Sequence, residues 1–282
     1  MARITSVATS SDLRHAVENW RANGDTIALV PTMGGLHAGH LKLVEEARRL
    51  CRRTVVSIFV NPTQFGAGED FDSYPRDMSS DHAKLAGLGV DLLYAPTAAE
   101  IYPDGFATEV RVSGLAEGLC AVQRPFHFTG VATVVAKLLN QCRPHMAMFG
   151  EKDYQQLLVI RRLVRDLDLG VEIVGVATVR ESDGLAMSSR NQALSHGGRA
   201  VAGRLNVLLE EVARRIAAGQ AVAEALSRGR DKLIALGFEA VDYLELRDAE
   251  TLTPLDQATR PARLLVAVHV EGCRLIDNIA LE

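Results

Sequence analysis

Short apolar runs alternate with amphipathic segments over the first two thirds of the chain. Such alternation is typical of βαβ units, in which helices join parallel strands and cover the sheet. In the clearest helical pattern, one face carries Val131, Val134, Val135, Leu138, Leu139 and Cys142. The runs that favour strands are residues 26–30, 54–60, 91–95, 145–149 and 171–179. The sequence therefore predicts an α/β fold with a Rossmann-like, doubly wound parallel sheet.

The pattern changes after residue 179. A polar stretch over residues 180–191 leads into a helix pattern, and a second helical stretch follows at 221–236. The first of these helix patterns is formed by Val201, Leu205, Leu208, Val212 and Ile216. Three short strand candidates at 240–246, 263–270 and 274–278 are close enough in sequence to pair as antiparallel strands. We therefore expect a Rossmann-like domain over residues 1–180 and a smaller C-terminal α+β domain over residues 181–282, with helices and a small antiparallel sheet.

Composition argues against several classes of protein. The 282 residues carry 31 basic and 35 acidic side chains, a net charge of −4, and the scattered basic residues provide no footprint for gripping nucleic acid. No apolar run reaches the roughly 18 residues that cross a bilayer, and residues 1–19 lack the apolar centre of a signal peptide. Four well-separated cysteines without a CxxC pair indicate buried free thiols in a reducing compartment. We expect a cytoplasmic protein with no nucleic-acid or membrane partner.

A glycine-rich segment with two histidines follows the first predicted strand and opens a helix. It consists of Met33, Gly34, Gly35, Leu36, His37, Ala38, Gly39 and His40. The glycines let backbone N–H groups approach a ligand, the helix N-terminus favours an anion, and the imidazoles can hydrogen-bond phosphoryl oxygens. The alternative is that one histidine caps the helix while the other packs. The spacing is neither a P-loop nor a GxGxxG fingerprint; it resembles the HxGH signature of nucleotidylyltransferases and class I aminoacyl-tRNA synthetases.

Two other polar segments suit the remaining parts of a nucleotide. The first, after the strand predicted at 145–149, consists of Gly150, Glu151, Lys152 and Asp153. Here the glycine permits close approach, the lysine offers a point charge for phosphate, and the aspartate can accept from ribose hydroxyls. The second lies on the polar stretch and consists of Met187, Ser188, Ser189 and Arg190, whose hydroxyls and guanidinium can bind a leaving pyrophosphate. The alternatives are a surface charge cluster for the first and a solvated loop for the second.

Carboxamide side chains mark a site for a small polar acid. Asn61 and Gln64 flank Pro62, where the second predicted strand breaks. Carboxamides can recognise hydroxyl and carboxylate groups without adding a competing charge. The alternative for Asn61 is that it caps a turn. Of Gln155 and Gln156, which begin the helix after the lysine segment, we expect one to face the ligand.

Four motifs in this order closely resemble those of the pantoate–β-alanine ligase family. They read PTMGGLHAGH, SIFVNPTQF, FGEKDYQQL and DGLAMSSRN, and segments 124–131 and 275–278 also match. The resemblance runs from about residue 24 to residue 278, nearly the whole chain. Two departures are visible: Phe126 stands where a small residue is common, and residues 196–198 (His-Gly-Gly) replace an acidic helix start. We expect the first to alter packing around His127 and the second to weaken the start of a helix.

The resemblance implies an ATP-dependent ligation of (R)-pantoate with β-alanine through a pantoyl adenylate, with Mg²⁺. It assigns catalysis to His37, His40 and Lys152, with His40 as proton donor. It assigns ATP binding to residues 33–40, Gly150, Glu151, Lys152, Asp153, the backbone of Val179, Met187, Ser188, Ser189 and Arg190. It assigns substrate binding to Gln64, Gln156 and Asn61, and places Asp81 near Mg²⁺. It further implies a C-terminal domain that acts as a lid and a homodimer formed through the N-terminal domain.

Three alternatives remain at this point. Another HxGH adenylyltransferase would need basic residues for a phosphorylated acceptor where this chain has Asn61 and Gln64. A nucleotide-sensing binding protein would retain the site without turnover, although the histidines, Lys152 and residues 187–190 are all present. A ligase that forms an acyl phosphate would release ADP instead of AMP and pyrophosphate.

Overall fold

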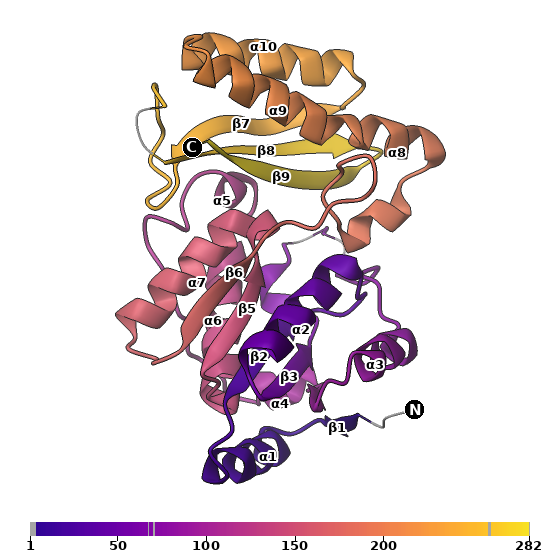
Figure 1. The fold of residues 1–282 in the computed structure, drawn as a ribbon, viewed down its shortest axis with the longest axis vertical. Coiled ribbons are helices and arrows are strands. Elements are labelled where there is room, and N and C mark those ends of the chain that lie inside the picture. The colour runs from indigo at the N-terminus through magenta and orange to yellow at the C-terminus, as the bar shows by residue number, and fades with distance from the viewer. Residues whose placement is uncertain (1–3, 67, 70, 259–260, 282) are drawn as a thin grey trace. The chain divides into compact units, whose positions relative to one another are not determined.

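The chain divides into two compact units in the computed structural model, which describes residues 4–66, 68–69, 71–258 and 261–281 (Figure 1). The first unit comprises Met1–Glu151 and Gln156–Ala177, and the second comprises Lys152–Gln155 and Thr178–Glu282. Lys152–Gln155 thus belongs to the second unit. A single boundary near residue 180 would place this segment in the first domain. The functions predicted for the two domains stay predictions.

The secondary structure follows the alternation in the sequence. In chain order, the elements are β1 (Thr5–Val7), α1 (Ser10–Ala22), β2 (Ile27–Thr32), α2 (Ala38–Leu50), β3 (Arg53–Ile58), the 3₁₀ helix η1 (Pro62–Gln64), α3 (Met78–Gly87), β4 (Leu92–Tyr94), α4 (Ala98–Ile101), α5 (Cys120–Gln123), α6 (His127–Cys142), β5 (Met146–Gly150), η2 (Glu151–Asp153), α7 (Tyr154–Asp166), β6 (Glu172–Val176), η3 (Ser189–Ala193), α8 (His196–Ala202), α9 (Arg204–Ala217), α10 (Val222–Ala235), β7 (Ala240–Asp248), β8 (Ala262–Val270) and β9 (Cys273–Leu281).

The first unit contains a parallel sheet with the strand order β1-β4-β3-β2-β5-β6, which confirms the predicted doubly wound fold. Residues 27–30 of β2 are fully buried, as expected for a strand with helices on both faces of its sheet. The strand order reverses at β2: the chain continues from it through β3 and β4 on one side and later through β5 and β6 on the other. Ligands of such sheets bind beyond the carboxyl ends of the strands at this switch point. The loop after β2 and Gly150 at the end of β5, both in the first unit, therefore lie where such a ligand binds.

The edge strand β1 was not predicted from the sequence. It has three residues, of which Thr5 and Ser6 are exposed, and it pairs with β4. So short a polar run shows no apolar pattern, and only pairing with a distant strand defines it. The strand predicted at 171–179 is shorter than expected, because β6 ends at Val176.

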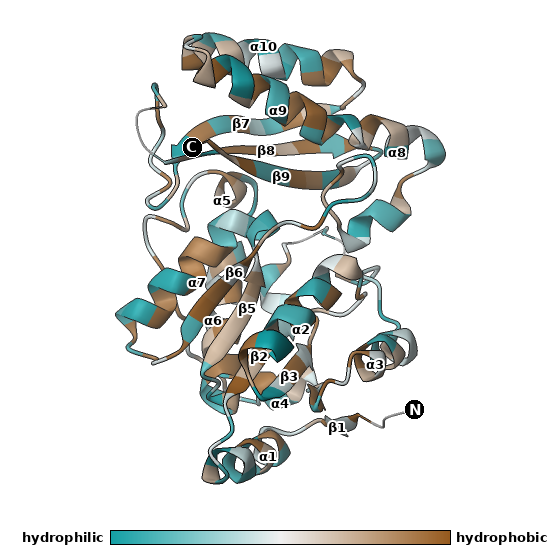
Figure 2. Cartoon of the chain, viewed as in Figure 1, coloured by the Kyte–Doolittle hydropathy of each residue, from teal (hydrophilic) through white to brown (hydrophobic). Residues whose placement is uncertain are grey.

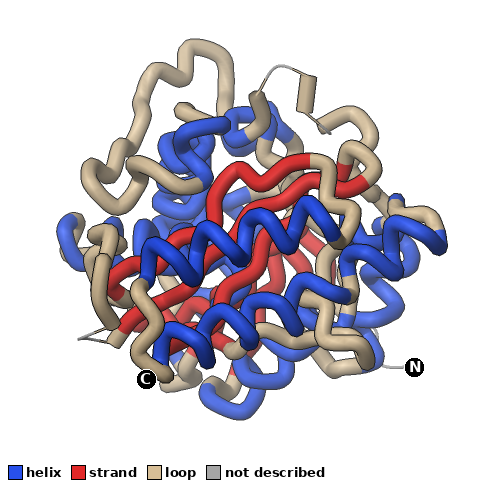
Figure 3. The backbone as a smooth tube through the Cα atoms, turned by 90° about the horizontal axis from the view of Figure 1, so that it is seen from above, coloured by secondary structure: helices blue, strands red, loops and turns tan. Residues whose placement is uncertain are grey.

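The second unit packs two helices against one antiparallel sheet. The strands β7, β8 and β9 pair in sequence order, as predicted, and α9 and α10 lie side by side across them (Figure 3). Polar and apolar residues alternate along both helices (Figure 2). The apolar residues contribute to one core, which includes Leu209 and Val212 of α9, Leu233 of α10 and Val266 of β8. The single helix pattern predicted at 201–216 is two helices, α8 and α9, which meet at Gly203, a poor helix former.

Candidate active site

The two histidines of the first loop cap α2 through one nitrogen each. His37 is the N-cap residue, and its Nδ1 accepts a hydrogen bond from Gly39 N–H at 3.1 Å. His40 Nδ1 accepts from His37 N–H at 3.4 Å, and the ring centroids lie 4.1 Å apart. Because each Nδ1 accepts from a backbone N–H, a neutral ring carries its proton on Nε2. Both histidines therefore cap α2, whereas the alternative expected one to cap and the other to pack, and both rings lie at a helix N-terminus, where an anion is favoured.

Asp81 on α3 holds the backbone of the same loop. It is 2% exposed; its Oδ2 accepts from Gly35 N–H and its Oδ1 from Leu36 N–H, both at 2.8 Å. Lys84, one turn further along α3, donates to the Leu36 carbonyl at 2.7 Å. Gly34 has φ +86°, and a Cβ there would lie 3.2 Å from Asp81 Oδ2. Glycine at this position therefore lets the loop adopt a left-handed turn against α3.

These contacts do not fit the interpretation of Asp81 as a Mg²⁺ ligand. Both of its carboxylate oxygens accept backbone hydrogen bonds, and Lys84 Nζ lies 3.8 Å from Oδ1. Within the described ranges, no three or more His, Cys, Asp or Glu side chains are grouped so that they could hold a metal ion. The described side chains thus offer no grouped set of metal ligands, and the contacts of Asp81 hold the backbone of the loop.

Asn61 is buried and contacts Gln64 directly. It is 1% exposed, caps η1, and donates from Nδ2 to Gln64 Oε1 at 3.1 Å and to the Gly130 carbonyl at 3.2 Å. Gln64 in turn directs its Nε2 to Met33 Sδ at 3.3 Å, a weak acceptor. The capping alternative is thus confirmed for Asn61. Its amide also orients Gln64, with the carbonyl turned inward and the NH₂ group toward the segment that begins at Met33.

Tyr102, which the sequence analysis missed, orients Asn61. Its hydroxyl donates to Asn61 Oδ1 at 2.7 Å, and the Thr63 hydroxyl donates to the same oxygen at 3.0 Å. Burial raises the pKa of Tyr102, so the hydroxyl remains a donor over the physiological range. The Thr63 backbone N–H, which can only donate, also points at Asn61 Oδ1 at 3.4 Å, and the Gly130 carbonyl, which can only accept, binds Nδ2; together they exclude the flipped Asn61 amide. No spacing in the sequence links residue 102 to residue 61.

The backbone of Gln64 is held from α6 and the segment before it. Arg124 donates to the Gln64 carbonyl at 3.2 Å, and His127 Nδ1 lies 3.0 Å from the same oxygen. At Gly130, a Cβ would lie 2.5 Å from the Thr63 carbonyl oxygen, so only glycine allows α6 to approach η1 this closely. Phe126 is 78% exposed, and the His127 ring packs edge-on against Phe128. The unusual residue at position 126 thus points to solvent.

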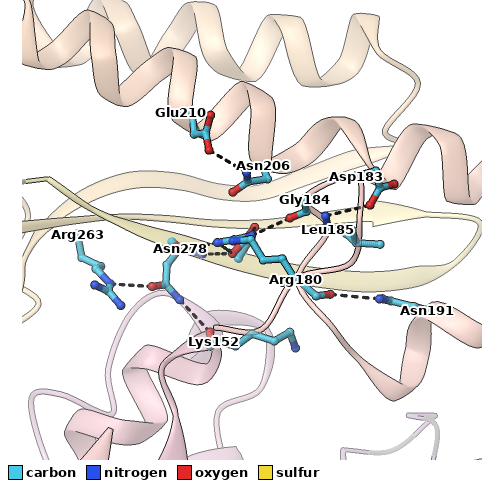
Figure 4. A network of polar contacts seen from close by, with 12 residues as sticks. Lys152, Arg180, Asp183, Gly184, Leu185, Asn191, Asn206, Glu210, Arg263 and Asn278 are labelled. Atoms are coloured by element: carbon cyan, nitrogen blue, oxygen red, sulfur yellow. Dashed lines mark hydrogen bonds and ion pairs between the residues drawn. The ribbon is translucent and has the colours of Figure 1, made fainter. Parts of the chain in front are cut away.

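The segment after β5 passes from the first unit to the second after Glu151. Gly150 ends β5, and a Cβ there would meet no atom within 4 Å, which leaves open space beside the backbone. Lys152 and Asp153, in η2, belong to the second unit, where the Lys152 carbonyl accepts from Asn278 Nδ2 at 2.9 Å (Figure 4). Of the two glutamines that follow, Gln155 is 4% exposed and Gln156 is half-buried. Gln156 is therefore the more accessible of the pair.

The polar stretch after β6 is ordered by its own backbone. The Val179 carbonyl accepts from Met187 N–H at 2.9 Å, and Arg180 and Ala186 form an antiparallel bridge. We call residues 180–186 the Arg180 turn. Ser188 then caps η3 by accepting from Arg190 N–H at 3.3 Å, and Ser189 is 7% exposed. The segment predicted as a loop is thus a tight turn followed by a 3₁₀ helix.

The prediction of buried thiols is confirmed for three of the four cysteines. Cys51, Cys120 and Cys142 are buried thiols outside any disulfide, and Cys273 is a half-buried thiol outside any disulfide. Burial raises the pKa of Cys142 to about 12, which makes it unreactive. In the described part of the chain, no helix is both long enough and apolar enough to cross a membrane.

Comparisons with known proteins agree with this geometry. The family profile described as pantoate-beta-alanine ligase matches residues 5–280. A pantothenate synthetase from Rhodospirillum rubrum is 56% identical over 272 residues, 96% of each chain. The crystal structure of pantothenate synthetase from Thermus thermophilus superposes with a TM-score of 0.93 at 50% identity and covers 98% of this chain and 99% of that one. A pantoate-beta-alanine ligase from Francisella tularensis, in complex with beta-gamma ATP and beta-alanine, has a TM-score of 0.83 at 32% identity and covers 98% of this chain and 97% of its own. The chain belongs to the pantoate–β-alanine ligase family.

Proposed function

We propose that this chain joins (R)-pantoate and β-alanine to form pantothenate, with ATP converted to AMP and pyrophosphate. The observation that carries the proposal is the pair of imidazole Nε2–H donors at the N-terminus of α2, linked through Met33 to the amide of Gln64. The imidazole donors can stabilise the charge that develops on a phosphate during displacement. The Gln64 amide can hydrogen-bond the hydroxyl and carboxylate groups of a small hydroxy acid. A nucleotide and the acid it activates would thus be bound by adjoining segments of one unit.

The reaction consists of two displacements. A pantoate carboxylate oxygen bonds to the α-phosphorus of ATP as the bond to the β-phosphate oxygen breaks, which gives pantoyl adenylate and pyrophosphate. The neutral amine of β-alanine then bonds to the acyl carbon, AMP leaves with the electron pair of the C–O bond, and the amine loses a proton to solvent. No covalent enzyme intermediate is needed, so catalysis comes from positioning and from donors aimed at the developing charge.

The residue roles in this proposal are those that the family resemblance implies. His37 and His40 donate to phosphate oxygens, with His40 as proton donor, and Lys152, Ser188, Ser189 and Arg190 bind the phosphates. Gly150, Glu151 and Asp153 bind the ribose side, and Val179 contacts adenine through its backbone. Gln64 and Gln156 bind pantoate, Gln64 also lies near β-alanine, and Asn61 acts through Gln64, because it is buried beneath it.

Mg²⁺ enters in this proposal as part of the substrate. The described side chains do not form a resident magnesium site. Mg²⁺ is commonly bound through nucleotide phosphates and retained waters with few protein ligands. MgATP is therefore the form of the nucleotide that the protein would bind.

Isotope exchange tests the reaction directly. The protein is incubated with ATP, Mg²⁺, labelled pyrophosphate and pantoate, without β-alanine. Label should enter ATP only when pantoate is present. ADP formation would indicate an acyl phosphate, exchange with a phosphorylated acceptor instead of pantoate would indicate another adenylyltransferase, and no exchange by folded protein would leave a nucleotide-binding role. Each of these three outcomes contradicts the proposal.

Three further parts of the proposal come from the family resemblance or, for the cytoplasmic location, from the composition of the sequence. A homodimer formed through the N-terminal domain is tested by light scattering on the purified protein. A cytoplasmic location is tested by fractionation of the source cells. The lid role of residues 181–282 is tested by amide exchange at Ser188 and Ser189, which should slow when an ATP analogue is bound. Equal exchange with and without the analogue would contradict it.

A further inference from the structure

Asn278 on β9 holds the main chain of Lys152. Asn278 is 3% exposed; its Nδ2 donates to the Lys152 carbonyl at 2.9 Å, and its Oδ1 accepts from Arg263 Nε at 2.7 Å (Figure 4). These two partners determine the amide orientation, because a guanidinium can only donate and a carbonyl can only accept. The Lys152 side chain extends away from this contact (Figure 4). Asn278 therefore fixes where the side chain starts and leaves its ammonium group free to point elsewhere.

A second attachment lies two residues further along the Lys152 segment. The guanidinium of Arg263, which also binds Asn278, lies 4.1 Å from the ring centroid of Tyr154. The Tyr154 hydroxyl donates to the Ala249 carbonyl at 2.8 Å. The strands of the C-terminal sheet and the loop after β7 thus attach residues 152–154 at three points. All of these contacts lie within the second unit.

Asp277, the preceding residue on β9, anchors the Arg180 turn. Its side chain is fully buried and accepts two hydrogen bonds from Arg180, at 2.7 and 3.0 Å. Arg180 also donates to the Gly184 carbonyl at 3.0 Å, within the turn. Bidentate pairing of this kind restrains the guanidinium in both position and angle. The chain leaves this turn directly into Met187.

The open edge of the sheet explains why these residues can act together. β9 is an edge strand that pairs only with β8 in the sheet. The backbone of Asn278 bonds away from β8, since its N–H donates to Asp277 Oδ1 and its carbonyl accepts from Arg180 at 3.4 Å. An unpaired edge offers hydrogen-bonding groups to another segment. Here the edge binds segments that carry groups assigned above to ATP phosphates.

We propose that Asp277 and Asn278 are positioning residues for ATP, which act from one strand through the Arg180 turn and through Lys152, respectively. Asn278 fixes the position of the Lys152 main chain. Asp277 binds Arg180 and thereby fixes the position at which the segment Met187–Arg190 begins. This inference rests on the proposed roles of Lys152 and Arg190 in binding phosphate. It assigns a function to the Leu-Ile-Asp-Asn motif at residues 275–278, none of which has a role in the proposed reaction steps.

The test compares single-atom changes in the full-length protein. Asn278→Asp keeps the acceptor for Arg263 and replaces the donor to Lys152 with an oxygen, and Asp277→Asn weakens the anchor of Arg180. Asp242→Asn is the matched control, because Asp242 pairs with Arg274 at 2.7 Å and His269 at 3.0 Å on the same sheet without contacting Lys152 or Arg180. We expect kcat/KM for ATP to fall about tenfold in the first two variants. The KM values for pantoate and β-alanine should stay unchanged, and the control should match wild type.

A double variant separates positioning from general destabilisation. If Asn278 acts through Lys152, Asn278→Asp should cause no further loss of pantoate-dependent exchange in a Lys152→Ala background, since coupled residues are not additive. Equal ATP kinetics in Asn278→Asp and wild type, an equal loss in Asp242→Asn, or additive losses in the double variant would overturn the inference. Failure of the proposed function is a different result, in which the wild-type protein shows no pantoate-dependent exchange.

Discussion

The histidine loop and the Lys152 segment position phosphate-binding groups in opposite ways. The histidines are held by backbone N–H groups two and three residues away in the chain. The Lys152 main chain is held by Asn278, which lies 126 residues later. The histidine caps form within one motif, although Asp81 also holds the backbone of that loop, whereas the contact at Lys152 exists only after the C-terminal sheet has formed. The caps should therefore survive changes in β9, whereas the geometry at Lys152 should depend on the edge of β9.

The largest effect should come from removing the Nε2 donors while the caps remain. In His37→Asn, the amide oxygen can replace Nδ1 as acceptor because asparagine is a preferred N-cap residue. In His40→Asn, at N3, the amide oxygen can take the place of Nδ1 in the capping box. We expect kcat/KM to fall by about a hundredfold or more, since one charge-stabilising donor contributes about 3 kcal/mol. The melting temperature should stay near that of wild type.

The matching alanine variants show whether the two roles are separate. His37→Ala and His40→Ala should lose as much activity and also become less stable, by roughly 1 kcal/mol for a lost cap. Steady-state kinetics and thermal denaturation of all four variants give the answer. Folded asparagine variants with near-normal turnover would contradict the assigned roles and reduce the histidines to caps.

Lys152→Ala tests the other side of the comparison. The variant keeps the carbonyl that Asn278 binds, so the segment should stay in place while the charge is lost. We expect a loss of about a hundredfold in pantoate-dependent exchange, with little change in melting temperature. Lys42→Ala is the control, because Lys42 forms exposed ion pairs with Glu45 and Glu46. Similar activity in the two variants would remove Lys152 from the site.

The sequence predicts what depends on local periodicity. Residues 27–30 of β2 form a continuous apolar run and are fully buried in the sheet, and the histidine motif lies at the start of a helix as its glycines and spacing indicate. The three C-terminal strands also appear as predicted. Each of these features is encoded within about ten neighbouring residues.

Contacts between distant residues were beyond the sequence analysis for a physical reason. The family resemblance places Asp81 near a metal ion. In the structure, its carboxylate accepts hydrogen bonds from the backbone N–H groups of Gly35 and Leu36. Tyr102 lies in none of the motifs, and the match of segment 275–278 to the family gives Asn278 no role, since both roles depend on which segments the fold brings beside these residues. A buried carboxamide or hydroxyl needs partners, but a single sequence does not say which ones.

Asp81→Asn tests an intermediate case, a loop with local caps that also depends on a distant carboxylate. An amide can accept from only one of Gly35 and Leu36 without turning its NH₂ toward the other N–H. We expect roughly a thirtyfold loss in kcat/KM, which corresponds to about 2 kcal/mol for an unsatisfied buried donor. Added Mg²⁺ should not restore activity. Recovery at high Mg²⁺ would instead favour a metal-ligand role.

The smallest effect should come from Tyr102→Phe, which removes one of two hydroxyl donors to Asn61 Oδ1. Thr63 still donates, so Gln64 should lose only part of its preference for one orientation. We expect kcat/KM for pantoate to fall about tenfold, as for one lost hydrogen bond, with KM for ATP unchanged. Steady-state kinetics with each substrate varied in turn give these values.

Tyr94→Phe is the matched control for this variant. Tyr94 is buried and, like the half-buried Tyr102, its hydroxyl donates to a carboxamide, Gln141 Oε1, at 3.1 Å, but Gln141 has no role in the site. Both variants should become less stable by about 1 kcal/mol, and only Tyr102→Phe should change the kinetics with pantoate. Equal kinetic effects would mean that a buried tyrosine hydroxyl acts through overall stability. An effect specific to pantoate would show that Tyr102, which is distant in sequence, helps to orient Gln64 through Asn61. Positioning by a distant residue would then occur in the first unit as well as at Lys152.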